Sequence, residues 1–331
     1  MEQFKALWIT KDESSGKIMP ATWKSTRVDD LSAGDVLVKV THTTVNYKDG
    51  MALSNNPAII RRFPMIPGID VIGEVAQSSS PKFSEGDPVI LNGYGLSEVH
   101  TGGYASYARV NSNWLVRRPA EISARRAAAI GTAGYTAMLC VLALEQYGIS
   151  PDKGPVAVSG ASGGVGTVAL SILSKLGYHT IAFTGRENET EFLKGLGANE
   201  VRNRSEIGLA GEPFQKESWA GAVDVAGSHT LANLISRANY GGAVAACGIA
   251  QGYGLEASML PFILRSVALL GVDSVHAPMH LREQAYERLV CDLDLHKLDS
   301  LSESCQLDEV PEKAAAILQG KIRGRLVVEV D

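Results

Sequence analysis

The pattern of apolar and polar positions changes about a third of the way along the chain. Before that point, short runs of β-branched and apolar residues alternate with clusters of glycine, proline, aspartate and serine. Short runs bounded by such turn residues predict strands, and strands at this spacing predict a small barrel or sandwich. We expect strands at Ala6–Ile9, Val36–Thr41, Val71–Val75, Pro88–Leu91 and Tyr104–Val110.

From Ser123 onward, helical periodicity appears and then alternates with strands. Ser123 is a candidate N-cap for a first helix, and Tyr135–Gln146 is a second, strongly apolar helix. In Val165–Leu176 the apolar residues recur at helical spacing along one face. The remaining expected elements are strands at Pro155–Ser159, His179–Thr184, Ala222–Ala226, Ala243–Ala246 and Val267–Val272, and helices at Glu189–Leu196 and Leu231–Ala238. This alternation predicts a doubly wound parallel sheet.

In the last part of the chain, the pattern predicts helices at Leu281–Leu293 and Pro311–Leu318 and a last strand at Arg325–Val330. The uncharged stretch Ala127–Leu144 contains several glycine and threonine residues, so we interpret it as a buried helix with its lead-in loop. The N-terminus is charged from its second residue and has no secretory apolar region, which favours a cytoplasmic location.

Composition narrows the function classes. With 331 residues, the chain is long enough for two domains. The net charge of −5 without a basic block disfavours binding to nucleic acid or to an anionic membrane. The four cysteines form no C-x-x-C pair, which disfavours a disulfide framework or a cysteine-rich zinc site.

The segment with the most specific chemistry is a glycine-rich turn between a predicted strand and a predicted helix. Ala161–Gly166 fits G-x-G-x-x-G with alanine first, and the adjacent Gly160 can make the tight turn. Gly163 permits close approach of a pyrophosphate, and Gly166 permits close packing of helix on strand. The helix N-terminus then favours the diphosphate, so we predict dinucleotide binding, although a turn without ligand has the same pattern.

The next predicted strand ends in Thr184, Gly185 and Arg186 rather than in an acidic residue. An aspartate or glutamate here would bind the ribose 2′-hydroxyl of NAD, whereas space and a guanidinium suit a 2′-phosphate. Arg202 and Arg204 follow shortly afterward and add charge, unless they are ordinary surface residues. We therefore predict NADP(H).

Several motifs match one known superfamily. They are Asn46-Tyr47-Lys48-Asp49, Pro67-Gly68-Ile69-Asp70, Gly131–Ala137 and the glycine-rich turn. The chain resembles the medium-chain dehydrogenase/reductase superfamily over nearly its whole length, within its zinc-free quinone oxidoreductase branch. Further stretches look like the bacterial acryloyl-coenzyme A reductase group; these are Arg62–Asp70, Gly131–Cys140, Pro261–Arg265 and Gly271–Val275.

The resemblance implies an α/β fold with a GroES-like β-rich catalytic domain at 1–126 and 277–331. A Rossmann domain at 127–276 would be inserted into it, and members of this branch are usually homodimers. The zinc enzymes of the superfamily need cysteine and histidine ligands that this chain lacks, since Cys140 is its first cysteine. We therefore expect no metal, and reduction of a polarised C=C bond rather than oxidation of an alcohol.

The implied reaction delivers hydride from NADPH to the β-carbon of an α,β-unsaturated thioester, and a proton then adds at the α-carbon. The resemblance puts Tyr47 at the nicotinamide, where it donates this proton or merely packs while water donates it. Asp49 would orient this loop or polarise Tyr47. Asn46 is a candidate donor to the enolate oxygen, or a turn former. Lys48 is interpreted as a solvated charge.

The remaining candidate contacts also follow from the resemblance. Diphosphate contacts are expected from Ser162, Gly163, Gly164 and Val165, and 2′-phosphate contacts from Thr184, Gly185, Arg186 and Arg204. Contacts nearer the nicotinamide or the domain junction are expected from Ile249, Ile263, Ser274 and Gln319, although relatives often have asparagine at the last position. Arg61 and Arg62 are candidates for coenzyme A phosphates, or are solvated loop residues.

Two other functions fit the same motifs. One is an NADPH-dependent quinone or enone reductase. The other is a non-catalytic NADPH-binding protein, against which the intact Tyr47, Asp49 and glycine-rich turn argue.

Overall fold

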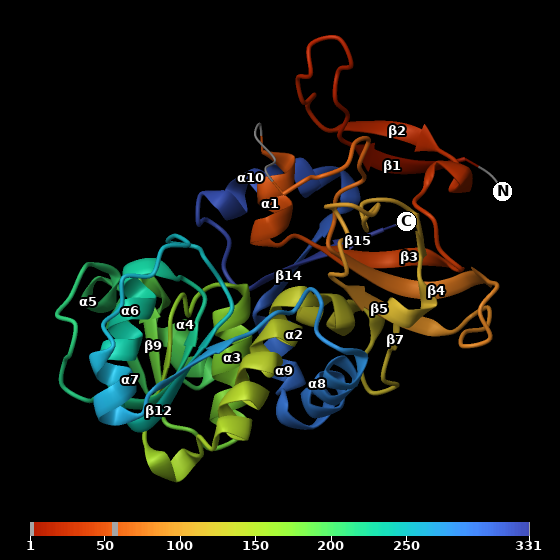
Figure 1. Ribbon diagram of the computed structural model, residues 1–331. Helices are drawn as coiled ribbons and strands as arrows, with labels where there is room; N and C mark the ends of the chain where they lie inside the picture. The colour runs from red at the N-terminus through yellow and green to blue at the C-terminus, as the bar shows by residue number, and fades with distance from the viewer. Residues whose placement is uncertain (1–2, 55–58, 331) are drawn as a thin grey trace. The chain divides into compact units, whose positions relative to one another are not determined.

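The computed structural model describes residues 3–54 and 59–330. Its contacts group the chain into two compact units. The first unit contains Met1–Thr132, Val275–Glu283 and Ser302–Asp331, and the second contains Ala133–Ser274 and Gln284–Leu301. The domain boundaries expected from the sequence, at 126/127 and 276/277, stay a prediction. Both units combine strands and helices (Figure 1).

The first unit is built on a mixed sheet with strand order β14-β15-β3-β4-β5-β7, and β6 pairs with β3. β1 and β2 form a separate antiparallel pair. The strands are β1 (Phe4–Trp8), β2 (Thr22–Thr26), β3 (Val36–Thr44), β4 (Asp70–Ser78), β5 (Pro88–Asn92), β6 (Tyr107–Val110), β7 (Val116–Arg117), β14 (Ser302–Gln306) and β15 (Arg325–Glu329). Strands from both ends of the chain share this sheet, because β15 pairs with β3.

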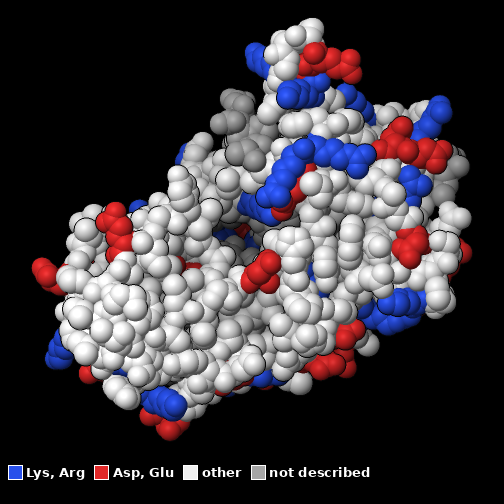
Figure 2. Space-filling model, viewed as in Figure 1, with Lys and Arg blue, Asp and Glu red and all other residues white. Residues whose placement is uncertain are grey.

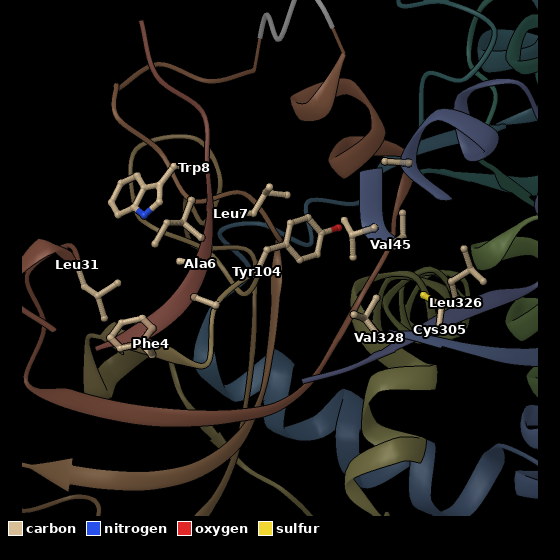
Figure 3. Packing of buried hydrophobic residues seen from close by; sticks show 14 of the residues in the cluster. Phe4, Ala6, Leu7, Trp8, Leu31, Val45, Tyr104, Cys305, Leu326 and Val328 are labelled. Carbon is tan, nitrogen blue, oxygen red and sulfur yellow. The ribbon is translucent and has the colours of Figure 1, made fainter. Parts of the chain in front are cut away.

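Apolar side chains from distant segments form the core of the first unit. Figure 3 shows the ring of Tyr104 between Leu7 and Val45, with its hydroxyl group turned toward Val45. That hydroxyl is buried and donates a hydrogen bond to the carbonyl oxygen of Thr44 at 3.0 Å. Leu326 from β15 belongs to the same cluster, so the last strand of the chain completes the core begun by the first.

Two helices of the first unit pack tightly together. They are α1 (Tyr47–Leu53) and α10 (Val310–Leu318), which lie side by side in Figure 1. Gly50 allows this approach, because a Cβ atom there would lie 2.9 Å from the carbonyl oxygen of Ala314 and from Leu318. Real Cβ contacts are almost never that short, so the sequence needs glycine at this position.

The second unit contains a fully parallel sheet with strand order β10-β9-β8-β11-β12-β13. Numbered from its own first strand, this order is 3-2-1-4-5-6, the order of dinucleotide-binding sheets. The strands are β8 (Val156–Val158), β9 (Thr180–Thr184), β10 (Glu200–Asn203), β11 (Trp219–Asp224), β12 (Ala238–Ala246) and β13 (Ala268–Gly271). The sequence interpretation of a doubly wound parallel sheet beside a GroES-like unit is confirmed.

Helices flank this sheet, with α3 on one side and α6 and α7 on the other (Figure 1). Leu231, Leu234 and Ile235 of α6 pack with Phe183 and Trp219 of the strands. The helices of the second unit are α3 (Gly164–Lys175), α4 (Thr190–Leu196), α5 (Ser205–Gly208), α6 (Ser228–Ser236), α7 (Leu260–Arg265) and α9 (Leu295–Ser300). α2 (Ala124–Tyr147) and α8 (Met279–Asp292) each contribute residues to both units.

The helix α2 combines the two apolar helices that the sequence predicted. Its backbone departs from helical geometry at Gly131, with φ 45° and ψ −162°. By length and by its mean hydropathy of 1.8, α2 could cross a membrane, but 83% of that window is buried inside the protein. A helix buried in this way is the interpretation that the sequence favoured for this stretch.

The expected strands and helices differ from the observed ones mainly at the ends and in exposed places. The strand expected at Tyr104–Val110 begins only at Tyr107, because Tyr104 packs in the core as part of a loop. β2 and β14 were not predicted, because their mostly polar residues leave few side chains buried. α1, α7 and α9 were also missed, since six or seven residues do not establish a helical period.

We predict that Gly50→Ala lowers the free energy of unfolding. The cost of overpacking, about 1–3 kcal/mol, exceeds the gain of about 1 kcal/mol in helix propensity. The matched control is Gly195→Ala in α4, where a new Cβ atom meets nothing within 4 Å. Urea unfolding of both variants measures the difference, and equal stabilities would contradict the packing of α1 on α10.

Candidate active site

The glycine-rich turn of the second unit has the geometry that its sequence predicts. Gly160 has φ +56°, and a Cβ atom at Gly166 would lie 2.5 Å from the carbonyl oxygen of Gly160. Gly163 is the N-cap of α3, so the helix begins at Gly164 and Val165. The first N–H groups of a helix have no partner within it, and they form a site for an anionic group. Ser162 completes the turn, and its Oγ lies 2.7 Å from Oγ1 of Thr184.

The end of β9 brings together the residues predicted for a 2′-phosphate. The backbone N–H of Arg204 donates to the carbonyl oxygen of Thr184 at 2.8 Å. The Arg204 side chain lies against Gly185, where a Cβ atom would be only 2.5 Å from its Nε. The backbone N–H of Arg186 donates to Oγ1 of Thr184 at 3.1 Å. Gly185 thus leaves room for the Arg204 guanidinium, a group that suits a phosphate ester, and the Arg186 backbone lies beside the same Thr184.

Arg202 forms an ion pair with a neighbouring residue. Its Nε and Nη2 donate to one carboxylate oxygen of Glu200, at 3.0 and 2.5 Å. Arg202 is thus paired with Glu200 at the surface, and its added charge for a phosphate stays a prediction.

Four other predicted contacts lie on exposed or terminal positions. Ile249 follows β12 and is 59% exposed, and Ile263 in α7 is 65% exposed. Ser274 is the last residue before the chain returns to the first unit. Gln319 is the C-cap of α10 in the first unit and is exposed. Exposed isoleucine side chains suit a contact with an apolar cofactor face, but these four roles stay predictions.

In the first unit, the Asn46–Asp49 motif forms the beginning of α1. Asn46 is the N-cap, Tyr47 is the first helical residue, and Tyr47 is 46% exposed. The Asp49 carboxylate accepts from the backbone N–H of Asn46 at 2.8 Å, as glutamate does in a capping box. The sequence therefore puts a half-exposed phenol on a firmly capped helix start.

Asp49 is fully buried and accepts further hydrogen bonds from Asn46 Nδ2 at 3.2 Å and from the backbone N–H of Ile69 at 3.0 Å. Burial and, second, the nearby charge of Asp70 together raise its pKa to about 7, although these hydrogen bonds act in the opposite direction. The pKa of Tyr104 is raised well above its usual value, first by burial and then by Asp49 and Asp70. Burial therefore favours the protonated form of both side chains, Asp49 and Tyr104.

Asp70 is the centre of a buried hydrogen-bond network. Its carboxylate accepts from Thr44 Oγ1, from Asn46 Nδ2 at 2.9 Å and from Asn92 Nδ2 at 2.7 Å. Thr132 also donates to it, through its Oγ1 at 2.5 Å and its backbone N–H at 3.1 Å. Four donor residues from three separate segments thus satisfy one carboxylate that is 0% exposed.

Arg325, only 2% exposed, supplies a cation beside this network. Its Nη1 donates to Oδ1 of Asn46 at 3.1 Å, and its Nε donates to the carbonyl oxygen of Ala129 at 2.7 Å. Gly131 makes room for it, because a Cβ atom there would lie 2.6 Å from Arg325 Nη2 and 2.9 Å from Asp70 Oδ2. Only glycine combines that space with φ 45°.

Sequence reasoning gave no role to Asp70, Thr132 or Arg325. The first two lie within motifs that carried the family resemblance, so their signal was present but unassigned. Arg325 opens a strand, and nothing in the sequence indicated that its side chain is buried.

Arg61 and Arg62 lie in a loop of the first unit and are exposed. Both backbone N–H groups donate to the carbonyl oxygen of Glu98, and Arg61 Nε lies 3.8 Å from a Glu98 carboxylate oxygen. Lys48 forms an ion pair with the same carboxylate. Two of these three cations thus face Glu98, and the group keeps an excess of positive charge. On the face drawn in Figure 2, basic and acidic side chains are interspersed.

Comparison with known proteins places this arrangement in a family. Residues 32–120 match the alcohol dehydrogenase GroES-like domain, and residues 164–290 match the zinc-binding dehydrogenase family. The chain belongs to the medium-chain dehydrogenase/reductase superfamily. Its predicted membership is thereby confirmed.

Three similar proteins are informative. The chain is 45% identical to the acrylyl-CoA reductase AcuI of Ruegeria pomeroyi, over 99% of both chains. It is 43% identical to the putative quinone oxidoreductase YhfP of Bacillus subtilis, over 93% of this chain and 94% of that one. A solved structure, the yhdH oxidoreductase of Salmonella enterica in complex with NADP, has a TM-score of 0.95 and 46% identity, covering 99% of this chain and 100% of that one.

The name of the second matched family raises the question of zinc. Among residues 3–54 and 59–330, no group of three or more histidine, cysteine, aspartate or glutamate side chains is arranged to hold a metal ion. Pro67–Asp70, one of the motifs that carried the resemblance, contains no histidine or cysteine. The described residues therefore do not fit a zinc ion, and we derive no chemistry from one.

We predict that Asp49 weakens the fold as the pH rises. The folded protein holds the Asp49 proton up to a pKa of about 7, whereas an unfolded aspartate releases it near about 3.9. Unfolding therefore releases a proton between these values, and this contribution to the unfolding free energy falls as pH rises from about 4 to 7. Asp49→Asn removes the titration, so its stability relative to the wild type should improve from pH 5 to pH 8.

The matched control for this titration is Asp35→Asn. Burial alone would raise the Asp35 pKa, but hydrogen bonds from Ser112 lower it below its usual value. The difference between this variant and the wild type should therefore stay constant from pH 5 to pH 8. Denaturant unfolding at several pH values measures both differences, and a constant difference for Asp49→Asn would contradict the burial of a protonated carboxyl group.

Proposed function

We propose that this protein is an NADPH-dependent reductase of the C=C bond of α,β-unsaturated thioesters, of the type that converts acryloyl-coenzyme A to propanoyl-coenzyme A. The observation that carries the proposal is 45% identity over 99% of both chains to an acrylyl-CoA reductase. The intact Asn46–Asp49 motif and the 2′-phosphate group of residues support it.

The residues of the second unit fit NADPH well. The turn at Ser162–Val165 leaves room for a diphosphate, and Thr184, Gly185, Arg186 and Arg204 suit the 2′-phosphate. When bound, NADPH supplies a hydride to the substrate. We further propose that Ile249, Ile263, Ser274 and Gln319 line the rest of its path.

In the first unit, we propose that Tyr47 acts on the substrate, while the buried Asn46 and Asp49 position it. The exposed phenol of Tyr47 is able to donate a proton to the α-carbon, and Asn46 helps to hold the start of α1. Asp49 fixes the same helix start by accepting from Asn46. Arg61 and Arg62 provide positive charge for the phosphates of coenzyme A, and their position beside Glu98 suits a reversible ion pair.

The side-by-side oxidation of NADPH at 340 nm with acryloyl-coenzyme A and with a quinone tests the function. We expect fast turnover of the thioester and slow turnover of the quinone. Turnover of the quinone alone would favour the second candidate, a quinone reductase, which 43% identity to a putative quinone oxidoreductase supports. Tight NADPH binding without turnover of any acceptor would instead favour a non-catalytic binding protein.

Arg186→Ala should raise KM for NADPH far more than KM for NADH, because only NADPH has the 2′-phosphate. Loss of one charge-assisted phosphate contact corresponds to roughly 10-fold or more in KM. Arg202→Ala is the control, since Glu200 already binds its guanidinium. Steady-state kinetics with both cofactors gives the comparison, and equal changes for NADPH and NADH would remove Arg186 from the 2′-phosphate site.

Tyr47→Phe should lower kcat by about 100-fold, as expected for loss of a positioned proton donor. The change keeps the ring and removes only the hydroxyl group, so KM for NADPH should change little. Kinetics with the thioester at saturating NADPH provides the measurement. An unchanged kcat would mean that Tyr47 only packs and that water donates the proton.

We also propose a cytoplasmic homodimer formed through the edge strand β13. Within residues 3–54 and 59–330, this strand pairs with β12 on one side only, and Leu269 on it is 37% exposed. An unpaired edge with apolar side chains favours pairing with a second copy. Leu269→Glu should therefore shift the mass measured by light scattering from dimer to monomer, whereas Leu209→Glu, on an exposed loop, should not. A monomeric wild type would contradict the proposal.

A further inference from the structure

Asn92, at the end of β5, is hydrogen-bonded in two opposite directions. It is 1% exposed, and its side-chain Nδ2 donates to Oδ1 of Asp70 at 2.7 Å. Its backbone carbonyl oxygen accepts from Nη1 of Arg282 at 2.7 Å. One buried residue thus joins the Asp70 network to a guanidinium group on α8.

Arg282 extends this connection to the segment where the chain returns from the second unit. It is 1% exposed, and besides Asn92 it donates to the carbonyl oxygens of Val275, at 2.7 Å, and Ala277, at 3.0 Å. Its guanidinium also lies 4.0 Å from the centre of the Tyr94 ring. A single planar cation therefore contacts three carbonyl groups and one ring face.

Tyr94 ties the same two segments together independently. Its backbone N–H donates to the carbonyl oxygen of Val275 at 3.1 Å, and its hydroxyl group donates to that of Ala277 at 3.2 Å. Val275 directly follows Ser274, one of the proposed cofactor contacts. The loop after β5 thus holds the backbone next to Ser274.

In the other direction, the network reaches the start of α1. Asp70 accepts from Asn46, which immediately precedes Tyr47, and from Thr132, after which the chain enters the second unit. Asn92 and Asp70 are also direct partners in the pairing of β4 with β5. One strand pair therefore connects the Tyr47 helix, the outgoing chain at Thr132 and the returning chain at Val275.

We propose that Asn92 and Arg282 are positioning residues for the reaction, which hold the helix of Tyr47 and the segment following Ser274 in one fixed frame. They act through Asp70 and Val275, and neither touches the reacting atoms. The inference rests on the proposed function for its effect on rate, but its structural part does not depend on any activity.

The positioning depends on the donor geometry of Arg282 and Asn92. Lysine in place of Arg282 keeps the charge, but its single ammonium group cannot reproduce the planar set of donors to three carbonyl oxygens. Leucine in place of Asn92 keeps approximately the volume and removes the donor to Asp70. Asn92→Leu leaves Thr132 as the donor to Asp70 Oδ1, and Arg282→Lys leaves Tyr94 as the donor to Val275 and Ala277. Each change therefore removes part of the connection and permits the two segments to shift.

The first experiment is amide hydrogen exchange on the full-length protein. In Arg282→Lys and in Asn92→Leu, exchange should become at least about 10-fold faster in the peptide covering residues 46–53, far away in sequence. Arg109→Lys is the matched control, because Arg109 also donates to two buried-loop carbonyl oxygens, those of Leu31 and Ser32, in the first unit. Unchanged exchange at 46–53 in both test variants would overturn the proposal.

The second experiment measures kcat in a double-mutant cycle with Tyr47→Phe. We expect each positioning variant to lower kcat by roughly 10- to 100-fold with little change in KM for NADPH, since small misplacements have effects of this size. In the Tyr47→Phe background the further loss should be much smaller, because the group being positioned is gone. Losses that simply multiply would overturn the proposal.

The turnover assay tests the proposed function, and hydrogen exchange tests the positioning role of Asn92 and Arg282. If neither a thioester nor a quinone is turned over, the proposed function fails, while hydrogen exchange still tests the frame. If Arg282→Lys does not fold, Asn92→Leu carries both measurements, because it leaves the guanidinium and its three carbonyl contacts in place.

Discussion

The structure of the first unit depends on one buried carboxylate. Asp70 is completely enclosed and is satisfied by Thr44, Asn46, Asn92 and Thr132, which come from three separate parts of the chain. A buried charge is tolerable only when its hydrogen bonds are made, so the segments that supply these donors have to meet at this point. The start of α1, the end of β5 and the kink in α2 are therefore fixed relative to one another.

The same constraint explains two local features that are otherwise unusual. The backbone of α2 breaks at Gly131, which lets Thr132 turn its N–H and hydroxyl groups to Asp70 and leaves space for Arg325. Asp49 lies close enough to Asp70 for its pKa to rise to about 7, with burial as the larger cause. The carboxyl groups of Asp49 and Asp70 can thus share the interior with the Arg325 guanidinium, because the raised pKa of Asp49 favours its protonated form.

The sequence predicted the second unit better than the first for a physical reason. A glycine-rich turn between strand and helix needs specific glycines at fixed spacing, so Gly163 and Gly166 indicate both the fold and the ligand. Thr184, Gly185, Arg186 and Arg204 followed from the same logic, and they do lie together. The network around Asp70 joins residues far apart in sequence, with no spacing to detect, and the burial of Arg325 and Arg282 was equally invisible. Short elements such as α1 gave too few turns for a periodic pattern, although the Asn46–Asp49 motif within it carried the resemblance.

The central claim is that hydride is delivered to the β-carbon of an unsaturated thioester while the first unit directs the proton to the α-carbon. The most direct measurement is reduction of acryloyl-coenzyme A with NADPH carrying deuterium at the transferred position of the nicotinamide, followed by NMR spectroscopy of the product. The account predicts one deuterium at the β-carbon of the propanoyl thioester and none at the α-carbon. Deuterium at the α-carbon, or a labelled alcohol from reduction of the thioester carbonyl, would contradict it.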